Sequence, residues 1–195
     1  MMTDQVLTEQ LTIEEYIRLF DKEGPLEIID GEIIIMSPNV FGHIFTIRTL
    51  FLILHTFVTN FKLGEVFTES TFVLPDTSKQ WVKGSRLPDL IFIRAGRLDD
   101  YKTNTPDWRE KPLMIVPDLV VEVVSPGDSY SDIDRKVDTY LADGVERIWI
   151  IDPQRRKVRV HLQAQAHPIT YKDSQMLDGG ETLPEFSVKV SELFE

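Results

Sequence analysis

"PDLVVEVVSPGDSYSDIDRKVDTYL", residues 117–141, predicts a buried strand followed by a helix. Residues 117–124 form a nearly continuous apolar run, which is typical of a strand covered on both faces. After a Pro-Gly break, residues 129–143 carry apolar side chains at helical spacing, and Gly144 ends the helix. Residues 146–152 form another apolar strand, so this part of the chain predicts a parallel strand–helix–strand unit.

Two carboxylates interrupt the apolar strand, Asp118 and Glu122. An ionised Glu122 in such a strand is costly unless a cation or hydrogen-bond donors meet it. Asp118 lies about 13 Å away along the strand, at roughly 3.3 Å per residue, and we expect it to cap the strand entry as a secondary site residue at best. Asp89, in the apolar run "RLPDLIFI", is the better partner, because side chains directly opposite on paired strands lie only ~5 Å apart. Two such carboxylates predict a hard divalent cation, Mg²⁺ or Mn²⁺.

A third group, Lys136, lies on the predicted helix of residues 129–143. When Ile133, Val137 and Tyr140 face the sheet, Lys136 falls at the rim of that face. Its ammonium could orient a nucleophilic water and stabilise charge on a phosphate. The alternative is that this lysine only extends to water, as most lysines at a helix rim do.

The rest of the chain predicts further helices and strands. Residues 11–20 begin with a capping box, and an Asp-Gly turn joins two short strands after them. The most apolar stretch, residues 49–58, is expected to be too short to span a bilayer. The remaining elements are a buried helix over 39–61, strands over 64–74, 86–95 and 157–162, a lid or substrate-facing loop over 96–115, and short C-terminal hairpins.

Several other residues are candidates for a supporting role. His43 lies on the buried stripe of its helix, where a core histidine is the default, although the helix could aim it at the same cleft. Glu27 and Glu32 alternate in the first hairpin and are expected to face solvent, with a smaller chance of supporting the site. The basic segment 154–160 is the best phosphate-contact patch of the chain, or else a solvated strand edge.

Composition limits the class of protein. The 195 residues predict one domain, residues 1–195, with an N-terminal helix and hairpin (1–38), a core (39–152) and C-terminal strands (153–195). The absence of cysteine excludes thiolate zinc sites and thiol nucleophiles and fits a cytoplasmic protein, with no membrane partner expected. A net charge of -11 argues against a sequence-independent DNA coat, but not against a local metal-bridged site.

At these residues the chain resembles the PD-(D/E)XK nuclease superfamily, and more closely its Uma-type branch of restriction-endonuclease-like proteins. The resemblance rests on "LEIIDGEIIIMSP" followed by His43, on "RLPDLIFI", and on the segment from residue 117 to 153. It implies an α/β (α+β) fold, a restriction-endonuclease-like core with a mixed β-sheet flanked by helices in the order αβββαβ.

The resemblance also implies Mg²⁺-dependent hydrolysis of phosphodiester bonds. It does not name the substrate, and DNA is our own leading interpretation. By motif, the metal ligands fall on Asp89, Glu122 and the backbone carbonyl of Val123. The superfamily places a lysine two residues after the second acid, where this chain has Val124. In the Uma-type branch that lysine is thought to lie on the following helix, which fits Lys136.

Two other functions compete with a nuclease. A nuclease-fold protein could act as a catalytically silent binding or regulatory module through protein partners. A carboxylate pair could also hydrolyse glycosides, but this needs no metal or lysine, and the chain shows no aromatic-rich sugar platform. A homodimer would suit cleavage of both strands of a duplex.

Overall fold

The computed structural model describes residues 11–75 and 81–195. Its contacts divide the chain into two compact units. One comprises residues up to Pro38, Ser70–Leu87 and Tyr101–Val116, and the other comprises Asn39–Glu69, Pro88–Asp100 and Pro117–Glu195. All candidate catalytic residues lie in the second unit, which is described first.

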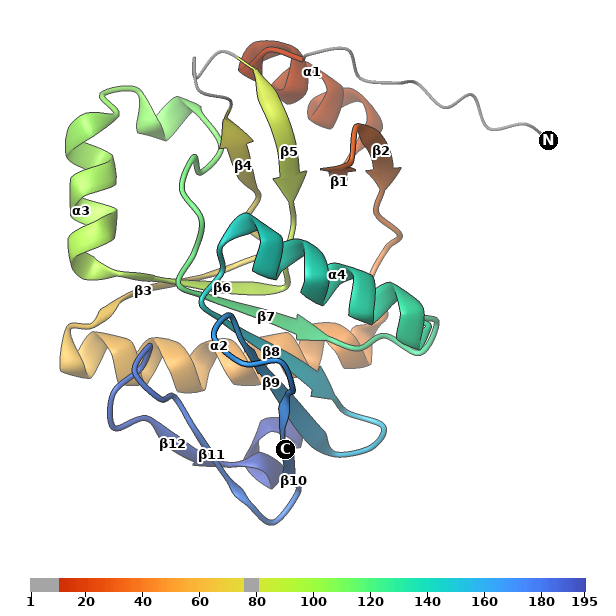
Figure 1. Cartoon of the computed structure of the whole chain (residues 1–195), viewed down its shortest axis with the longest axis vertical. Helices are drawn as coiled ribbons and strands as arrows, with labels where there is room; N and C mark the ends of the chain where they lie inside the picture. Colours follow the sequence, from red (N-terminus) through yellow and green to blue (C-terminus); the bar gives the residue numbers. More distant parts are fainter. Residues whose placement is uncertain (1–10, 76–80) are drawn as a thin grey trace. The chain divides into compact units, whose positions relative to one another are not determined.

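The second unit is built on a six-stranded sheet in the order β10-β9-β8-β7-β6-β3 (Figure 1). Strands β3, β6 and β7 pair antiparallel, whereas β7 and β8 run parallel because helix α4 connects them. This is the predicted mixed sheet with its strand–helix–strand unit. Its strands are β3 (Gly64–Thr68), β6 (Leu90–Arg94), β7 (Leu119–Val123), β8 (Arg147–Asp152), β9 (Lys157–Leu162) and β10 (Ile169–Lys172).

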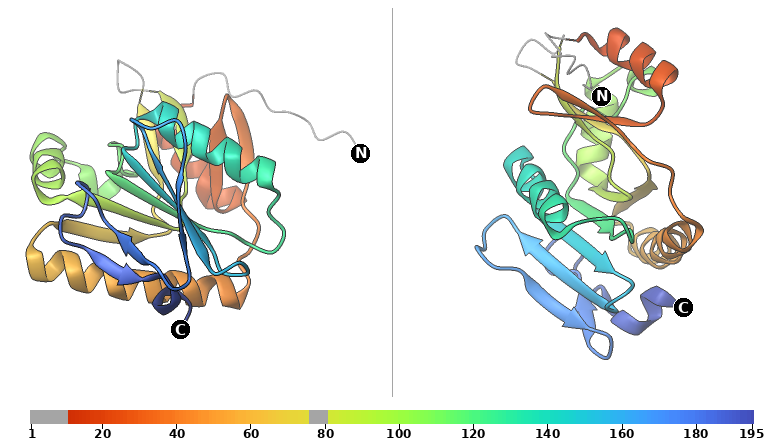
Figure 2. Two further views of the ribbon diagram at one scale, coloured as in Figure 1. Left: turned by 60° about the horizontal axis from the view of Figure 1, so that its bottom comes forward. Right: turned by 90° about the vertical axis from the view of Figure 1, so that its right-hand side faces the viewer.

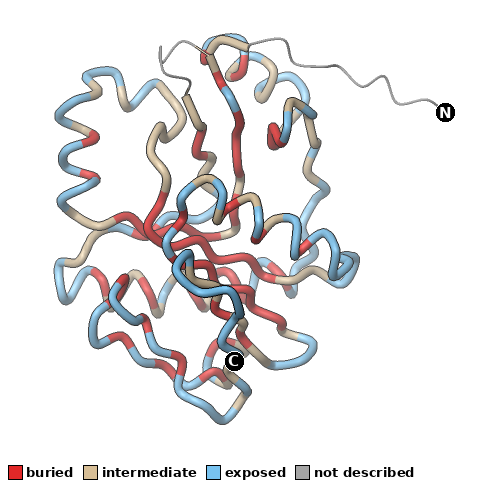
Figure 3. Tube along the Cα trace, in the orientation of Figure 1, coloured by how far each residue is buried: buried red, intermediate tan, exposed pale blue. Residues whose placement is uncertain are grey.

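Helices α2 (Phe41–Phe61) and α4 (Tyr130–Asp143) cover opposite faces of this sheet (Figure 2). Leu119, Val121 and Val123 point to the α2 side and join the main hydrophobic core, while Glu122 points to α4. The central strands β7 and β8 are buried along their whole length (Figure 3). The alternation predicted for residues 117–124 therefore decides which helix each side chain meets.

Local sequence signals fix both ends of α4. Ser129 and Asp132 form a capping box at its start, and Gly144 adopts a left-handed conformation at φ 97° after its end. The C-terminal part of the unit adds β11 (Met176–Asp178), which pairs with β12 (Ser187–Lys189), and the 3-10 helix η2 (Val190–Phe194). These are the short pieces expected after residue 162.

Helix α2 is longer than residues 49–58, the apolar stretch that was expected to be too short to span a bilayer. Among the described helices it is the one that is long and apolar enough to cross a membrane, by length and composition alone. Its inward residues, including Ile47, Leu50 and Leu54, pack in the main core. The prediction of a buried helix is confirmed for this face only, because the helix also carries exposed apolar side chains, Phe41, Ile44, Phe45, Leu52 and Phe61.

The first unit contains helix α1 and a four-stranded sheet in the order β2-β1-β5-β4. The capping box of Thr12 and Glu15 starts α1, and Asp30 and Gly31 form the turn between β1 and β2 with positive φ angles, both as predicted. Its elements are α1 (Ile13–Glu23), β1 (Leu26–Ile29), β2 (Glu32–Ile35), β4 (Phe72–Pro75), β5 (Val82–Arg86) and the 3-10 helix η1 (Trp108–Glu110).

Three expectations from the sequence are wrong. Residues 64–74 form two strands of different sheets, β3 and β4, because Glu69 takes a left-handed conformation at φ 45° and ends the extended run. Residues 96–115 are not a structureless loop, since α3 (Ala95–Asn104) occupies half of them and buries Leu98 and Tyr101. Glu27 is 2% exposed rather than solvent-facing, and its carboxylate accepts a hydrogen bond of 2.8 Å from the Leu87 N–H.

Candidate functional site

Asp89 lies one residue before β6, across the sheet from Glu122. The β6–β7 register pairs Leu90 with Val121, so the next opposing pair is Asp89 and Glu122. The Asp89 carboxylate replaces a main-chain acceptor at this point, because its Oδ2 accepts a hydrogen bond of 2.7 Å from the Val123 N–H. The register agrees with the expected pairing of the two strands. The Asp89 carboxylate bonds to His43 of α2, whereas the Glu122 carboxylate bonds to Lys136 of α4.

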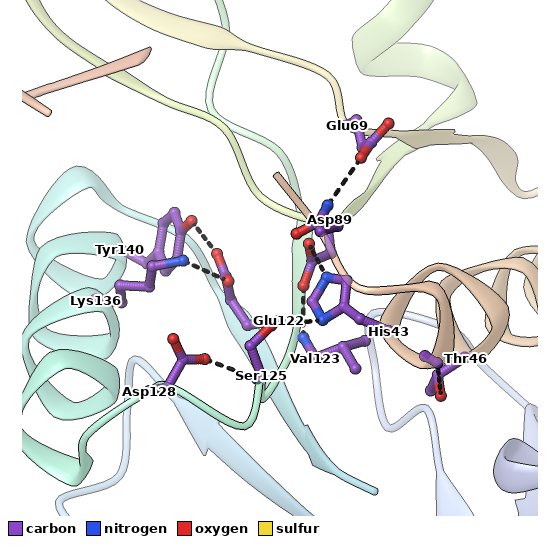
Figure 4. Close-up of polar contacts among 12 residues, drawn as sticks. His43, Thr46, Glu69, Asp89, Glu122, Val123, Ser125, Asp128, Lys136 and Tyr140 are labelled. Atoms are coloured by element: carbon purple, nitrogen blue, oxygen red, sulfur yellow. Dashed lines mark hydrogen bonds and ion pairs between the residues drawn. The ribbon is translucent and has the colours of Figure 1, made fainter. Parts of the chain in front are cut away.

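Glu122 receives a donor on each carboxylate oxygen, both from α4 (Figure 4). The Lys136 ammonium donates to Oε2 at 2.7 Å, and the Tyr140 hydroxyl donates to Oε1 at 2.5 Å. Lys136 and Tyr140 are one helical turn apart, so they reach the same group from one face. The predicted approach of Lys136 to Glu122 is thus present in the structure, and these donors compensate the burial of the carboxylate.

His43 joins Asp89 to the segment after β7. Its Nε2 lies 3.0 Å from Oδ1 of Asp89, and its Nδ1 lies 3.1 Å from the Ser125 hydroxyl. Burial alone would lower the pKa of His43, but the hydrogen bond and charge of Asp89, with further carboxylates nearby, raise it above its usual value. The raised pKa widens the pH range in which the imidazole is charged, and in that form its hydrogen bond to Asp89 is charge-assisted.

A small, partly open pocket lies beside Glu122 between β7 and α4, and neither Asp89 nor His43 lines it. Carboxylates of Glu122, Asp128 and Asp132 and the ammonium of Lys136 line it, together with apolar side chains. Asp128 also caps the turn, since its carboxylate accepts a hydrogen bond of 2.8 Å from the Ser125 N–H. A water molecule or a small ion can therefore approach Glu122 from the α4 side.

The donor chemistry fits a hard divalent cation, although the site is not a closed cage. Mg²⁺ is commonly held by one or two carboxylates while it keeps several waters, and Asp89 and Glu122 supply such a pair. The N–H and C=O of one strand residue point to the same side, so the Val123 carbonyl faces Asp89 as its N–H does. Within residues 11–75 and 81–195, no three His, Asp or Glu side chains converge closely enough to hold a metal by themselves.

Two of the candidate supporting residues do not join this cluster. Asp118 is fully buried four residues before Glu122, where its carboxylate binds the Arg94 N–H and the guanidinium groups of Arg94 and Arg97. This is a structural ion-pair network at the other end of β7. Glu32 is exposed on β2, in the first compact unit.

The basic segment 154–160 is largely engaged with neighbouring acids. Arg155 pairs with Asp152 at 3.2 Å, and Arg156 pairs with Asp173 at 2.5 Å. Its arginines remain partly exposed, so the segment can still present positive charge to a phosphate.

Sequence reasoning missed the polar roles of Tyr140, Ser125 and Glu69. The sequence placed Tyr140 on the buried face of its helix, and a buried tyrosine hydroxyl normally has a hydrogen-bond partner. Because Tyr140 lies one turn from Lys136, that partner could have been sought at Glu122 or its neighbours on the strand. Ser125 carried no pattern beyond its place before Pro126. Glu69 donates its N–H to the Asp89 carbonyl and accepts from Asn39, a contact that no spacing in the sequence indicates.

Comparisons with known proteins give a consistent result. A family model described as Uma2, putative restriction endonuclease, matches residues 13–191. A crystal structure of a putative nuclease belonging to DUF820 from Anabaena variabilis is similar with a TM-score of 0.75 and 20% sequence identity, over 94% of this chain and 97% of that chain. This likeness confirms the predicted fold class, a mixed sheet flanked by helices. No curated protein matches.

Proposed function

We propose that this chain, which belongs to the Uma2 family of putative restriction endonucleases, is a Mg²⁺-dependent nuclease that hydrolyses phosphodiester bonds of DNA. The observation that carries the proposal is the β6–β7 register, which continues to Asp89 and Glu122, together with the α4 ammonium beside Glu122. Asp89 and Glu122 oppose each other, and the Lys136 ammonium lies 2.7 Å from Glu122. An acid pair with an adjacent ammonium can hold a cation and meet a phosphate together.

The chain's own residues divide the work. Asp89, Glu122 and the Val123 carbonyl would hold Mg²⁺, which supplies Lewis acidity and an activated water when bound. Lys136 can stabilise the negative charge that develops on the phosphate, because its side chain is 29% exposed and faces the open pocket. His43 keeps Asp89 oriented through its hydrogen bond.

DNA as substrate is supported by the family and by local positive charge rather than by the net charge of -11. Arg155 lies over the Tyr130 ring at the start of α4, on the same unit as the site. Mg²⁺ and the arginines of the basic segment 154–160 would offset the repulsion between an acidic protein and a polyanion.

The proposal is tested by cleavage of plasmid and single-stranded DNA with Mg²⁺, and with the metal removed by a chelator. We expect cleavage by the wild type that the chelator stops, and loss of at least about 100-fold in Asp89→Asn. Asp138→Asn, an exposed acid on the outer face of α4, is the matched control and should cleave normally. Equal cleavage by wild type and Asp89→Asn would contradict the assigned site.

The alternative is a nuclease-fold module that binds partners without cleaving. One observation favours it: both oxygens of Glu122 already have donors from the protein. Absence of cleavage and of metal binding by a folded wild-type protein, with DNA present, would support this alternative.

A further inference from the structure

The two oxygens of Glu122 are held by donors of very different character. Tyr140, which binds Oε1, is 1% exposed and packs with Ile133 and Val137 on the inner face of α4. Lys136, which binds Oε2, has a side chain that is 29% exposed and ends at the open pocket. Figure 4 shows both side chains reaching Glu122 from the helix.

This difference determines which oxygen can change partners. The Tyr140 ring is 1% exposed and packed in the core, and a buried hydroxyl that gives up its hydrogen bond to Oε1 loses stabilisation that water cannot replace. A partly exposed ammonium on a flexible chain can move into solvent at little cost. Oε2 is therefore the oxygen that a cation can take, and Oε1 stays with Tyr140.

We propose that Tyr140 is a positioning residue, which fixes Glu122 so that it offers one oxygen, Oε2, to a divalent cation, while Lys136 holds that oxygen when no cation is bound. The inference rests on the proposed function and deepens it. It implies that Glu122 would hold a cation through Oε2 alone. It also predicts that Lys136 competes with the metal before it can act on a phosphate.

Tyr140→Phe tests the positioning role, since it removes the hydroxyl and keeps the ring in the core. Calorimetric titration with Mn²⁺ should show an affinity about 10-fold or more weaker than in the wild type, as is common when a partner of a ligand is lost. Tyr171→Phe is the matched control, because Tyr171 also donates to a carboxylate at 2.5 Å, that of Asp178, away from the site. Its Mn²⁺ affinity should equal that of the wild type.

Lys136→Met tests the competition without touching Tyr140, and it applies even if Tyr140→Phe does not fold. Removal of the ammonium takes away a donor to Oε2 and should tighten Mn²⁺ binding several-fold in the absence of DNA. Weaker Mn²⁺ binding in Lys136→Met, or unchanged binding in a folded Tyr140→Phe, would overturn the inference while leaving the nuclease proposal intact. A wild type that binds no Mn²⁺ would instead overturn the proposed function, and the inference with it.

Discussion

Replacement of Asp118 should lower the free energy of unfolding of the protein and leave the activity of the candidate site unchanged. The carboxylate is 0% exposed and accepts from the Arg94 N–H at 2.9 Å, besides pairing with the guanidinium groups of Arg94 and Arg97. Breaking a buried ion pair costs about 3–5 kcal/mol when the partner stays buried. Here the arginine side chains are 34% and 42% exposed and can turn to water, so most of that cost is avoided.

The remaining cost of Asp118→Ala comes largely from the stranded Arg94 N–H and the space left in the core, which gives roughly 2–4 kcal/mol in total. Asp118→Asn keeps an acceptor for that N–H and should lose about half as much. Urea unfolding measures both through a lower midpoint at constant slope, with the exposed Asp138→Asn as control. A loss below about 0.5 kcal/mol in Asp118→Ala, or loss of activity in protein that remains folded, would refute the structural role.

Three further changes have defined outcomes. His43→Leu, which has no donor, should weaken Mn²⁺ binding about 10-fold or more in calorimetry, because Asp89 loses its orienting partner, and unchanged affinity would count against that role. Burial lowers the pKa of His161 in the folded protein below its usual value of 6.5. As pH falls through 6.5, the unfolded chain therefore takes up a proton at this histidine before the folded protein does, and the free energy of unfolding decreases. His161→Gln should therefore flatten the stability curve between about pH 7 and 5, and an unaltered slope would contradict this reasoning. Gly64→Ala would place a Cβ 2.0 Å from the Ile93 carbonyl oxygen. Urea denaturation should therefore show a loss of more than about 2 kcal/mol in the free energy of unfolding, and an unchanged free energy would mean that β3 and β6 can move apart at little cost.

Periodicity and capping signals were sufficient to predict the central elements of the site-bearing unit. The apolar run around Glu122, the helix that follows it and the strand after that helix all lie where the sequence places them. The helical position of Lys136 also follows from spacing alone, because the buried face of α4 fixes the direction of every side chain on it. These are local properties, which a sequence pattern carries directly.

Contacts between distant segments were harder to predict. The strand over 64–74 was split because one non-glycine residue, Glu69, adopts a left-handed conformation that no composition rule indicates. Helix α3 was missed because it buries only Leu98 and Tyr101, too few apolar positions for a clear helical period. The bonds of Asp118 to Arg94 and Arg97 depend on strand pairing, and the sequence offered no way to choose that partner.

The assignment of Asp89 and Glu122 as cation ligands has a direct test. Calorimetric titration of the wild type and of Glu122→Ala with Mn²⁺ or Mg²⁺, with DNA cleavage assayed on the same samples, measures both consequences of that assignment. We predict saturable metal binding and metal-dependent cleavage by the wild type, and loss of both in a variant whose fold persists. Metal binding and cleavage that survive in Glu122→Ala, or a wild type that neither binds metal nor cleaves DNA, would contradict it.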